Sequence, residues 1–332
     1  MNITVNLEAK TYDIVIERGA MKHLADFIDL NRKVLVISDD GVPKEHIDTV
    51  LSQCKQGYSH IVKQGEGAKS FSVFQELCEV LLQYNFGRKD LVIAVGGGVI
   101  GDLAGFVASS YMRGISFVNI PTTTLSQIDS SIGGKVAINL NHVKNIIGTF
   151  YHPDVVIVDS DTLSTLPIRH YNNGLVEAIK AGLIYDEKLF ELMETTDIYE
   201  HVDEIIYRCL LVKKSIVEQD EKEQSLRKIL NFGHTIGHAI ETVYGLSELY
   251  HGECVAIGMI PMLEDEDLKN RTLAIYKKLS IQATAAYDKK QVMDIMCKDK
   301  KTHGSMITII KVKTLGKAEL HDIEMLELES YL

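Results

Sequence analysis

Four short, continuously apolar segments in the first half of the chain constrain its fold more than any other feature. They cover residues 33–38, 90–95, 116–120 and 154–158, and they are followed by Asp, Gly or Pro. Segments of this length and character are typical of strands that are buried on both faces. Residues 71–84, between the first two segments, have the apolar spacing of a helix. Buried strands that alternate with helices predict βαβ units and a mostly parallel sheet.

The pattern changes after about Pro167. Residues 174–192, 202–218, 226–244 and 253–268 have helical spacing, residues 289–296 indicate one more helix, and residues 308–313 indicate one late strand. Near the N-terminus, residues 3–7 and 12–16 predict an antiparallel hairpin at the edge of the sheet. We therefore predict two domains, an α/β domain over residues 1–166 and a mainly α-helical domain over residues 167–332.

A glycine-rich turn follows the second apolar segment. Gly96, Gly98 and Gly101 have the spacing GxGxxG between a predicted strand and a predicted helix. Such a turn lets backbone N–H groups approach a pyrophosphate at a helix N-terminus. The acidic residue expected about 20 positions later is missing, since Asn119 lies there, but Asp39 after the first segment could hold a ribose hydroxyl. The alternative is a tight glycine turn without a ligand.

A second glycine-rich segment, Ser130–Lys135, comes directly after Asp129 and precedes Lys144 and Asn145. It lacks the Walker spacing, so we do not expect an NTPase P-loop. Backbone amides with Lys and Asn side chains suit a phosphorylated small molecule, and Arg113 could add another anion contact. The alternative is that these lysines are ordinary surface residues.

The segment 226–241 offers metal ligands on an apolar background. Read as one helix, it places four polar side chains on a single stripe: Arg227, Asn231, His234 and His238. Gly233 and Gly237 within it fit the close approach of another backbone or a ligand. The i, i+4 spacing favours His234 and His238 as a zinc pair. An equally good set takes Glu177, His234 and His251 from three predicted helices, and spacing does not choose between them. The third possibility is a core helix with hydrogen-bonded histidines.

Composition narrows the classes of partner and compartment. The formal net charge of −11 argues against a nucleic-acid partner and against an anionic membrane surface. The five cysteines are scattered and contain no CxxC pair, which predicts a reducing cytoplasmic location without a disulfide framework. Neither a signal peptide nor a run of about 20 apolar residues is visible, so we expect no membrane association.

Several segments, taken together and in this order, resemble one family. They are Gly96–Asp102 (GGGVIGD), Asp129–Lys135 (DSSIGGK), Gly174–Lys180 (GLVEAIK), Asn231–His238 (NFGHTIGH) and His251–Glu253 (HGE). Over about residues 39–301 the chain resembles the 3-dehydroquinate synthases, which are sugar phosphate cyclases. The resemblance implies that residues 1–166 bind NAD and that residues 167–332 bind one divalent metal, zinc or cobalt, and the substrate.

The resemblance also implies a reaction. The substrate would be 3-deoxy-D-arabino-heptulosonate 7-phosphate (DAHP), and the products 3-dehydroquinate and phosphate. NAD would oxidise the substrate transiently, phosphate would be eliminated, the hydride would return, and an intramolecular aldol reaction would close the ring. A homodimer is implied as well, because Arg113 corresponds to an arginine that reaches the phosphate site of the neighbouring subunit.

Individual residues take expected roles from the same resemblance. The metal ligands would be Glu177, His234 and His251, which moves His238 from the metal to the substrate. The other substrate contacts would be Lys135, Lys180, Lys213, Arg227, Asn231, Asn145, Asp129 and Lys300 or Lys301, of which we favour Lys300. The NAD site would include Asp39, Glu66, Lys69, Gly97, Gly98, Asp102, Thr122 and Thr123, with Lys135 and Lys144.

Other readings of the same motifs stay open. The family often has Asp-x-Asn after the first strand, whereas this chain has Asp39-Asp40-Gly41, so one hydrogen bond to the adenosine would be lost. A sister cyclase of the 2-deoxy-scyllo-inosose synthase type would share the fold, NAD and metal, but its substrate lacks the carboxylate that Arg227 and Asn231 suit. A glycerol dehydrogenase-like alcohol dehydrogenase would need fewer anion-binding residues, and a non-catalytic metal or nucleotide sensor would not need the lysines.

Overall fold

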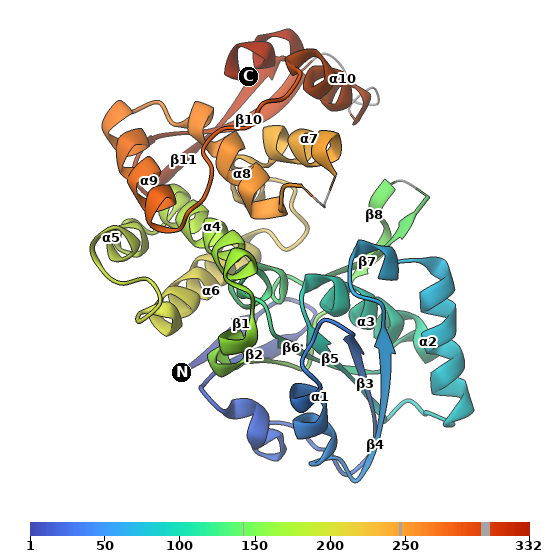
Figure 1. The fold of residues 1–332 in the computed structure, drawn as a ribbon. Coiled ribbons are helices and arrows are strands. Elements are labelled where there is room, and N and C mark those ends of the chain that lie inside the picture. Colours follow the sequence, from blue (N-terminus) through green and yellow to red (C-terminus); the bar gives the residue numbers. More distant parts are fainter. Residues whose placement is uncertain (142, 246–247, 300–305) are drawn as a thin grey trace. The chain divides into compact units, whose positions relative to one another are not determined.

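The structure is a computed structural model that describes residues 1–332 except 142, 246–247 and 300–305. The chain divides into two compact units, Met1–Pro167 and Ile168–Leu332, next to the predicted domain boundary. Figure 1 shows the elements of both units. The predicted fold class is confirmed, since the first unit is built around a mostly parallel sheet and the second is mainly helical. Among the described residues, no helix is both long enough and apolar enough to cross a membrane.

The first unit contains a seven-stranded sheet in the order β1-β2-β9-β6-β5-β3-β4. Its strands are β1 (Asn2–Asn6), β2 (Thr11–Ile16), β3 (Lys33–Asp39), β4 (Gln56–Val62), β5 (Leu91–Gly96), β6 (Ser116–Pro121) and β9 (Val155–Val158). Only β1 is antiparallel to its neighbour, so the predicted edge hairpin is confirmed. The helices are α1 (Lys44–Leu51), α2 (Phe71–Gln83) and α3 (Gly98–Ser110).

Both faces of this sheet are buried. Leu35 and Ile37 of β3 pack with α2 and α3 in one apolar cluster, and the alternate residues Val34 and Val36 pack with α1 in another. This two-sided burial explains why the central strands are continuously apolar. Strand β4 was not predicted from the sequence, because it lies at the sheet edge and most of its residues are polar and not buried.

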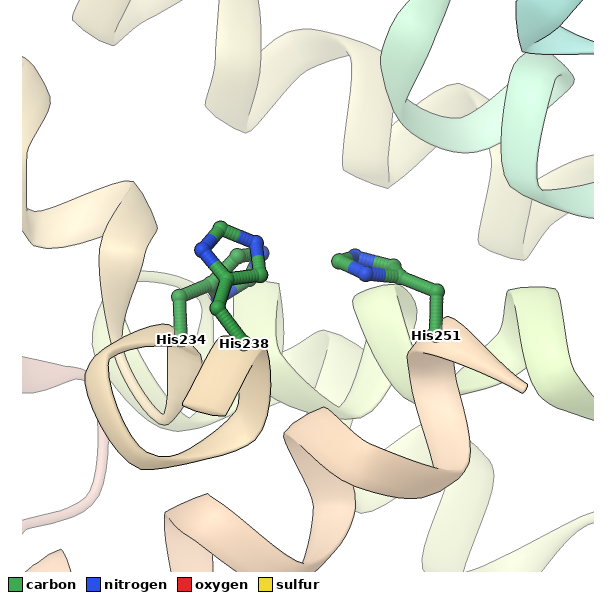
Figure 2. Close-up of side chains that lie close together, drawn as sticks. All are labelled: His234, His238 and His251. Atoms are coloured by element: carbon green, nitrogen blue, oxygen red, sulfur yellow. The ribbon is translucent and has the colours of Figure 1, made fainter. Parts of the chain in front are cut away.

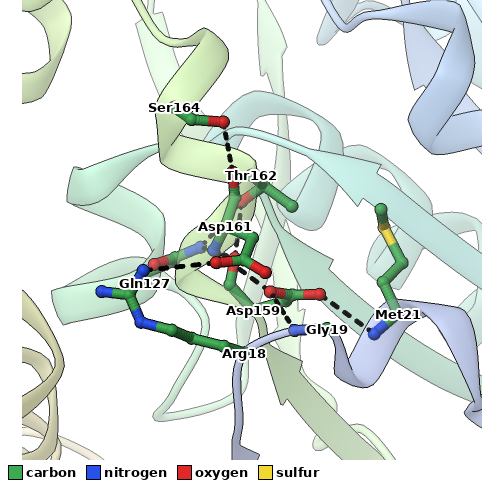
Figure 3. A network of polar contacts seen from close by, with 8 residues as sticks. All are labelled: Arg18, Gly19, Met21, Gln127, Asp159, Asp161, Thr162 and Ser164. Carbon is green, nitrogen blue, oxygen red and sulfur yellow. Dashed lines mark hydrogen bonds and ion pairs between the residues drawn. The ribbon is translucent and has the colours of Figure 1, made fainter.

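A polar network holds the carboxyl end of β9, as Figure 3 shows. The Asp159 carboxylate accepts hydrogen bonds from the backbone N–H groups of Gly19 (2.9 Å) and Met21 (3.1 Å). The buried Gln127 amide donates to Asp159 O and to Thr162 Oγ1, both at 3.0 Å. These bonds fasten the segment that follows β6 to the end of β9.

The second unit consists of helices and one hairpin. The helices are α4 (Ile168–Ile184), α5 (Glu187–Thr195), α6 (Val202–Gln219), α7 (His234–Tyr244), α8 (His251–Met259), α9 (Glu266–Lys278) and α10 (Lys289–Asp299). The hairpin pairs β10 (Met306–Thr314) with β11 (Lys317–Glu324), so the single late strand that we expected has a partner. Strand β11 alternates exposed and half-buried residues and lacks an apolar run.

The predicted single helix over residues 226–244 is wrong. Residues Leu226–Asn231 form a 3-10 helix, and α7 begins only at His234. Gly233 between them has φ of 78°, a left-handed conformation that ends the first helix. The stripe of four polar side chains on one helix therefore does not exist. The expected close backbone approach does, since a Cβ on Gly237 would lie 3.0 Å from the carbonyl oxygen of Cys254 on α8.

Two other long predicted helices are also divided. The predicted helix 174–192 is α4 followed by α5, with Asp186 capping α5 by accepting from Leu189 N at 3.1 Å. The predicted helix 253–268 is α8 and α9, separated near Pro261. Apolar periodicity continued through both breaks, so only the local caps and the proline marked them.

Candidate active site

The glycine-rich turn of the first unit forms the start of α3. Gly97 precedes this 13-residue helix, and Thr122 N donates to Gly96 O at 2.9 Å. A Cβ on Gly98 would lie 2.8 Å from Ser130 Oγ, so a larger residue there would require the serine hydroxyl to turn away. Thr123 hydrogen-bonds Ser126 at 2.8 Å beside the same turn. The open backbone N–H groups of a helix N-terminus can receive a phosphate group here.

Asp39 lies at the carboxyl end of β3, as predicted for a ribose-binding residue. Its carboxylate is buried and accepts from Gly41 N at 2.8 Å. Burial raises the pKa of Asp39 above its ordinary value. Next to it lies an open cavity of about 520 Å³, which is also lined by Pro43 and Ile47 of the loop and helix that follow β3. A carboxylate beside an apolar wall suits a nucleoside.

Lys69 is the centre of a polar cluster in the first unit. Its ammonium is almost completely buried and contacts Asp102 Oδ2 at 2.6 Å and Asn145 Oδ1. Asn139 joins the cluster by donating to Glu66 Oε1 at 2.8 Å and accepting from Asn145 N at 2.8 Å. Sequence analysis selected four of these residues separately and missed Asn139. They meet because the pairing of β7 (Lys135–Leu140) with β8 (Val143–Phe150) is irregular beside Asn139, and a β-bulge of this kind redirects side chains.

The remaining predicted residues of the first unit lie on or next to short turns. Lys135 begins β7 and is exposed, Lys144 is exposed on β8, and Asp129 is half-buried in a π-helical turn, Ser126–Ser130. Arg113 is exposed after α3, with φ of 67°. Three of these four charged groups are thus exposed at the surface of the first unit, and Asp129 is half-buried.

In the second unit, three predicted ligands meet at one point. His234 Nε2 lies 3.6 Å from Glu177 Oε1, and His251 Nε2 lies 3.7 Å from the same oxygen. The Glu177 carboxylate is 2% exposed, and no described residue donates a hydrogen bond to Oε1. A buried carboxylate oxygen that faces two imidazole nitrogens lacks its usual partner, which is the arrangement that a metal ion would complete.

The other nitrogen of each imidazole already has an acceptor. His234 Nδ1 lies 3.1 Å from the carbonyl oxygen of Phe232, and His251 Nδ1 lies 3.1 Å from Glu241 Oε2. In its neutral form, each imidazole would donate from Nδ1 in this contact and would present the Nε2 lone pair on the side of Glu177. Metal-binding histidines are usually held in this way. Glu241 was within the segment that sequence analysis selected, but no role was predicted for it.

His238 lies close to the same point. One ring nitrogen from each of His234, His238 and His251 lies within 4.8 Å of the other two. Figure 2 shows the three imidazoles gathered from α7 and the start of α8. His238 is exposed, whereas Glu177 is buried. Both ligand sets left open by spacing are therefore brought together, and only the set with Glu177 has an unsatisfied buried oxygen at its centre.

The charges of these groups follow from their surroundings. Burial, together with the nearby Lys180 ammonium, lowers the pKa of His234 to about 3, so its imidazole is neutral. Burial by itself raises the pKa of Glu177, but Lys180 and the two imidazoles outweigh it and hold that pKa well below the ordinary value. Burial lowers the pKa of His251, but Glu177 and Glu241 reverse this and raise it to about 9. A metal ion would therefore meet an ionised carboxylate and would have to displace one proton.

The second unit also buries three cations on α4 and on two segments that pack against it. Lys180 on α4 forms an ion pair with Glu177, and Lys213 on α6 and Arg227 are both buried. Arg227 is held by the backbone oxygen of Glu221 through its guanidinium. Buried Lys and Arg groups have the chemistry to bind an anionic substrate.

Acidic residues before α7 hold two of the predicted substrate contacts. Asn231 donates to Glu223 Oε1 at 2.7 Å, and Asp220 accepts from Arg227 N at 3.0 Å. Glu223 and Asp220 had no sequence signal beyond their charge. The predicted substrate lysine, Lys300, lies outside the described residues, and so does Lys301.

Comparison with known proteins places the chain in a family. Residues 59–173 match the 3-dehydroquinate synthase N-terminal family, and residues 174–302 match the corresponding C-terminal family. The chain is 40% identical to the 3-dehydroquinate synthase of Streptococcus suis (strain 05ZYH33), covering 100% of this chain and 99% of that protein. It is 37% identical to that of Clostridium botulinum (strain Alaska E43 / Type E3), covering 96% and 97%.

A solved structure shares the fold at lower identity. It is a 2-deoxy-scyllo-inosose synthase complexed with carbaglucose-6-phosphate, NAD+ and Co2+, with a TM-score of 0.90 and 24% identity over 100% of this chain and 99% of that chain. At this identity the likeness establishes the fold and not the substrate. The sequence relatives and both family matches agree, and this chain belongs to the 3-dehydroquinate synthase family.

Proposed function

We propose that the protein is a 3-dehydroquinate synthase that converts DAHP to 3-dehydroquinate and phosphate with NAD and one divalent metal ion, zinc or cobalt. The main support is that His234 and His251 both face one buried carboxylate oxygen of Glu177 that has no hydrogen-bond partner among the described residues. The chain also resembles these enzymes along its whole length.

Glu177, His234 and His251 would hold the metal ion. One carboxylate and two imidazoles, after His251 has given up its proton to bind, are a ligand set that zinc accepts, and three protein ligands leave room for substrate. His238, exposed beside them, would contact the substrate instead. When bound, the metal supplies Lewis-acid polarisation of substrate hydroxyls, and NAD supplies a reversible two-electron oxidation.

The first unit would hold NAD. The N-terminus of α3 with Gly97 and Gly98 suits the pyrophosphate, and Thr122 and Thr123 lie beside it. Asp39 would accept from a ribose hydroxyl at the cavity next to β3. Glu66, Lys69 and Asp102, which are linked through the Lys69 ammonium, would also belong to the NAD site, together with Lys135 and Lys144.

The chain's own side chains would orient the substrate and manage its charge. Arg227 suits a carboxylate because a guanidinium can bind it through two parallel hydrogen bonds. Lys180, Lys213 and Asn231 would bind the hydroxyl and phosphate oxygens from the second unit. The family resemblance assigns further substrate contacts to Asn145, Asp129, Lys135 and Lys300. Holding an anion among fixed cations lowers the barrier to phosphate loss without a further protein base.

Arg113 supports a proposed homodimer. It is exposed at a strained turn, and it would reach the phosphate site of a second copy of the chain. An Arg113→Ala variant mixed with an Arg227→Ala variant should recover activity if sites form across two chains, and should not if Arg113 acts within its own chain.

The five free cysteines fit a reducing cytoplasm, which is where we place the protein.

The first test is phosphate release from DAHP by purified protein with zinc and a catalytic amount of NAD, with NADH absorbance followed in parallel. Many phosphates per NAD without NADH accumulation would support the proposal. Release from glucose 6-phosphate or sedoheptulose 7-phosphate, but not from DAHP, would indicate a sister cyclase. Steady NADH production from glycerol would indicate a dehydrogenase.

His234→Ala should lose both bound metal and activity, and retention of stoichiometric metal would contradict the proposed role of His234 as a ligand.

A further inference from the structure

The start of α8 is capped only in part by its own residues, since Glu253 Oε2 accepts from Tyr250 N at 2.8 Å. A helix leaves its first backbone N–H groups without partners, and a Ser, Thr, Asp or Asn immediately before the helix usually accepts from them. Here that position is Tyr250, which is not a residue of this type. The acceptor comes instead from another helix, since Asn173 Oδ1 of α4 accepts from Gly252 N at 2.6 Å and from Glu253 N at 3.3 Å.

This cap joins two proposed metal ligands. His251 is the first residue of α8, directly before the capped groups, and Glu177 lies one helical turn after Asn173 on α4. Asn173 is 7% exposed, and its amide oxygen lies against the first turn of α8. The side chain of Asn173 therefore sets where the backbone of His251 lies relative to Glu177.

Two further contacts between α4 and α8 lie next to this cap. Arg169, one turn before Asn173, binds both carboxylate oxygens of Glu253 at 2.8 Å. Gly252 has no room for a side chain, because a Cβ there would collide with the backbone oxygen of Asn173. Residues 169, 173 and 177 thus contact three consecutive residues of α8, 253, 252 and 251, in a regular series.

We propose that Asn173 is a positioning residue that preorganises the metal site by capping α8 from α4. This inference rests on the proposed function, because it takes Glu177 and His251 as ligands. Without the cap, the first turn of α8 would fray, and His251 would have to be ordered again each time a metal ion binds. The loss should appear as weaker metal affinity, in the range of about 10–100-fold that is typical when groups supporting a ligand are removed.

Asn172 supplies a matched control on the same helix. It is also an asparagine, is 8% exposed, and makes two hydrogen bonds: its Nδ2 donates to Leu279 O at 2.8 Å, and its Oδ1 accepts from Tyr199 OH at 2.9 Å. Neither partner belongs to the site. Asn172→Ala therefore removes an equally buried amide and a similar number of hydrogen bonds without touching α8.

The experiment measures Co2+ binding to metal-free protein, by competition with a chelator and by the visible absorption of bound Co2+, alongside thermal unfolding of the metal-free forms. We expect Asn173→Ala to bind Co2+ at least tenfold more weakly and with an altered spectrum. Asn172→Ala should lower the melting temperature comparably but keep the wild-type affinity and spectrum. Asn173→Asp, which keeps the accepting oxygen in place, should restore most of the affinity.

Equal loss of affinity in the Asn172 and Asn173 variants, or wild-type affinity in Asn173→Ala, would overturn the inference. If Asn173→Ala does not fold, Asn173→Ser provides the same test with a smaller cavity, since its hydroxyl does not reach α8. Failure of the wild-type protein itself to bind one Co2+ would count against the proposed metal site rather than against the cap. The two failures are thus distinguishable.

Discussion

Gly233→Ala tests how the break between the 3-10 helix and α7 is enforced. Gly233 has φ of 78° and ψ of −16°. An alanine in the left-handed region costs about 1–2 kcal/mol, partly offset by about 0.4–1 kcal/mol from a stiffer unfolded chain. The space is closed as well, because the new Cβ would lie 2.8 Å from the carbonyl oxygen of Val255 and would collide with Met259. Overpacking of this kind costs about 1–3 kcal/mol more, so we expect a total near 2–4 kcal/mol.

Gly19→Ala is the matched control. Gly19 has nearly the same backbone conformation, with φ of 78° and ψ of 1°, and no atom lies within 4 Å of its hypothetical Cβ. It should therefore show only the conformational cost, which is about 1 kcal/mol after the unfolded-state offset. Urea unfolding monitored by fluorescence and circular dichroism would give both values.

The position of the helix break also predicts a functional difference. Gly233 directly precedes His234, so a shift of the backbone there would move a proposed metal ligand. Gly233→Ala should weaken Co2+ binding to the metal-free protein, and Gly19→Ala should not. The reasoning would be refuted if the two alanine variants were equally stable, since the contacts with α8 would then contribute nothing.

Three further predictions follow from other contacts. Glu241→Gln should weaken Co2+ binding by about 10–100-fold, because the His251 imidazole loses its charged partner. Competition with a chelator would measure this loss. Lys69→Met should lower the free energy of unfolding by about 1–3 kcal/mol and should be partly rescued by adding Asp102→Asn, whereas an additive double mutant would contradict the pairing. Arg271 binds both oxygens of Glu194 at 2.8 Å and thereby lowers the pKa of that carboxyl. The ion pair therefore stabilises the fold above the unfolded-state pKa of Glu194, near 4.5, and this stabilisation is lost as the pH falls through the lower folded-state pKa. Arg271→Gln should lower the free energy of unfolding by about 1 kcal/mol at neutral pH and by little in strong acid. Urea unfolding at a series of pH values would measure both.

Much of the first unit could be predicted from the sequence. The central strands are buried on both faces, so each is recognisable as an apolar run without knowledge of its neighbours. The glycine turn before α3 was visible for a different reason, because the spacing Gly96, Gly98 and Gly101 between a strand and a helix is a local sequence signal. Strand β4 and the β7–β8 hairpin were missed because their exposed faces carry mixed side chains, whose pattern does not differ from that of a loop.

The types of site residue were also visible, but their arrangement was not. His234, His238 and His251 were all candidates, and local spacing favoured the first two as a pair. That preference assumed one continuous helix from 226 to 244, whereas Gly233 turns the chain before α7 begins. The apolar periodicity on both sides of the glycine concealed the break, because periodicity records which faces are buried and not whether the helix is continuous.

By itself, the sequence determined the class of fold, the chemistry available to the site and, through its resemblance, the family. Only the tertiary structure decided which nitrogen of each histidine faces Glu177, which helix caps α8, and how Lys69, Asn139 and Asn145 meet. The physical reason is that strands, helices and turns depend on side chains close together in sequence. Hydrogen bonds such as that between Asn173 and Gly252 join residues far apart along the chain, and they form only after packing has brought their helices together.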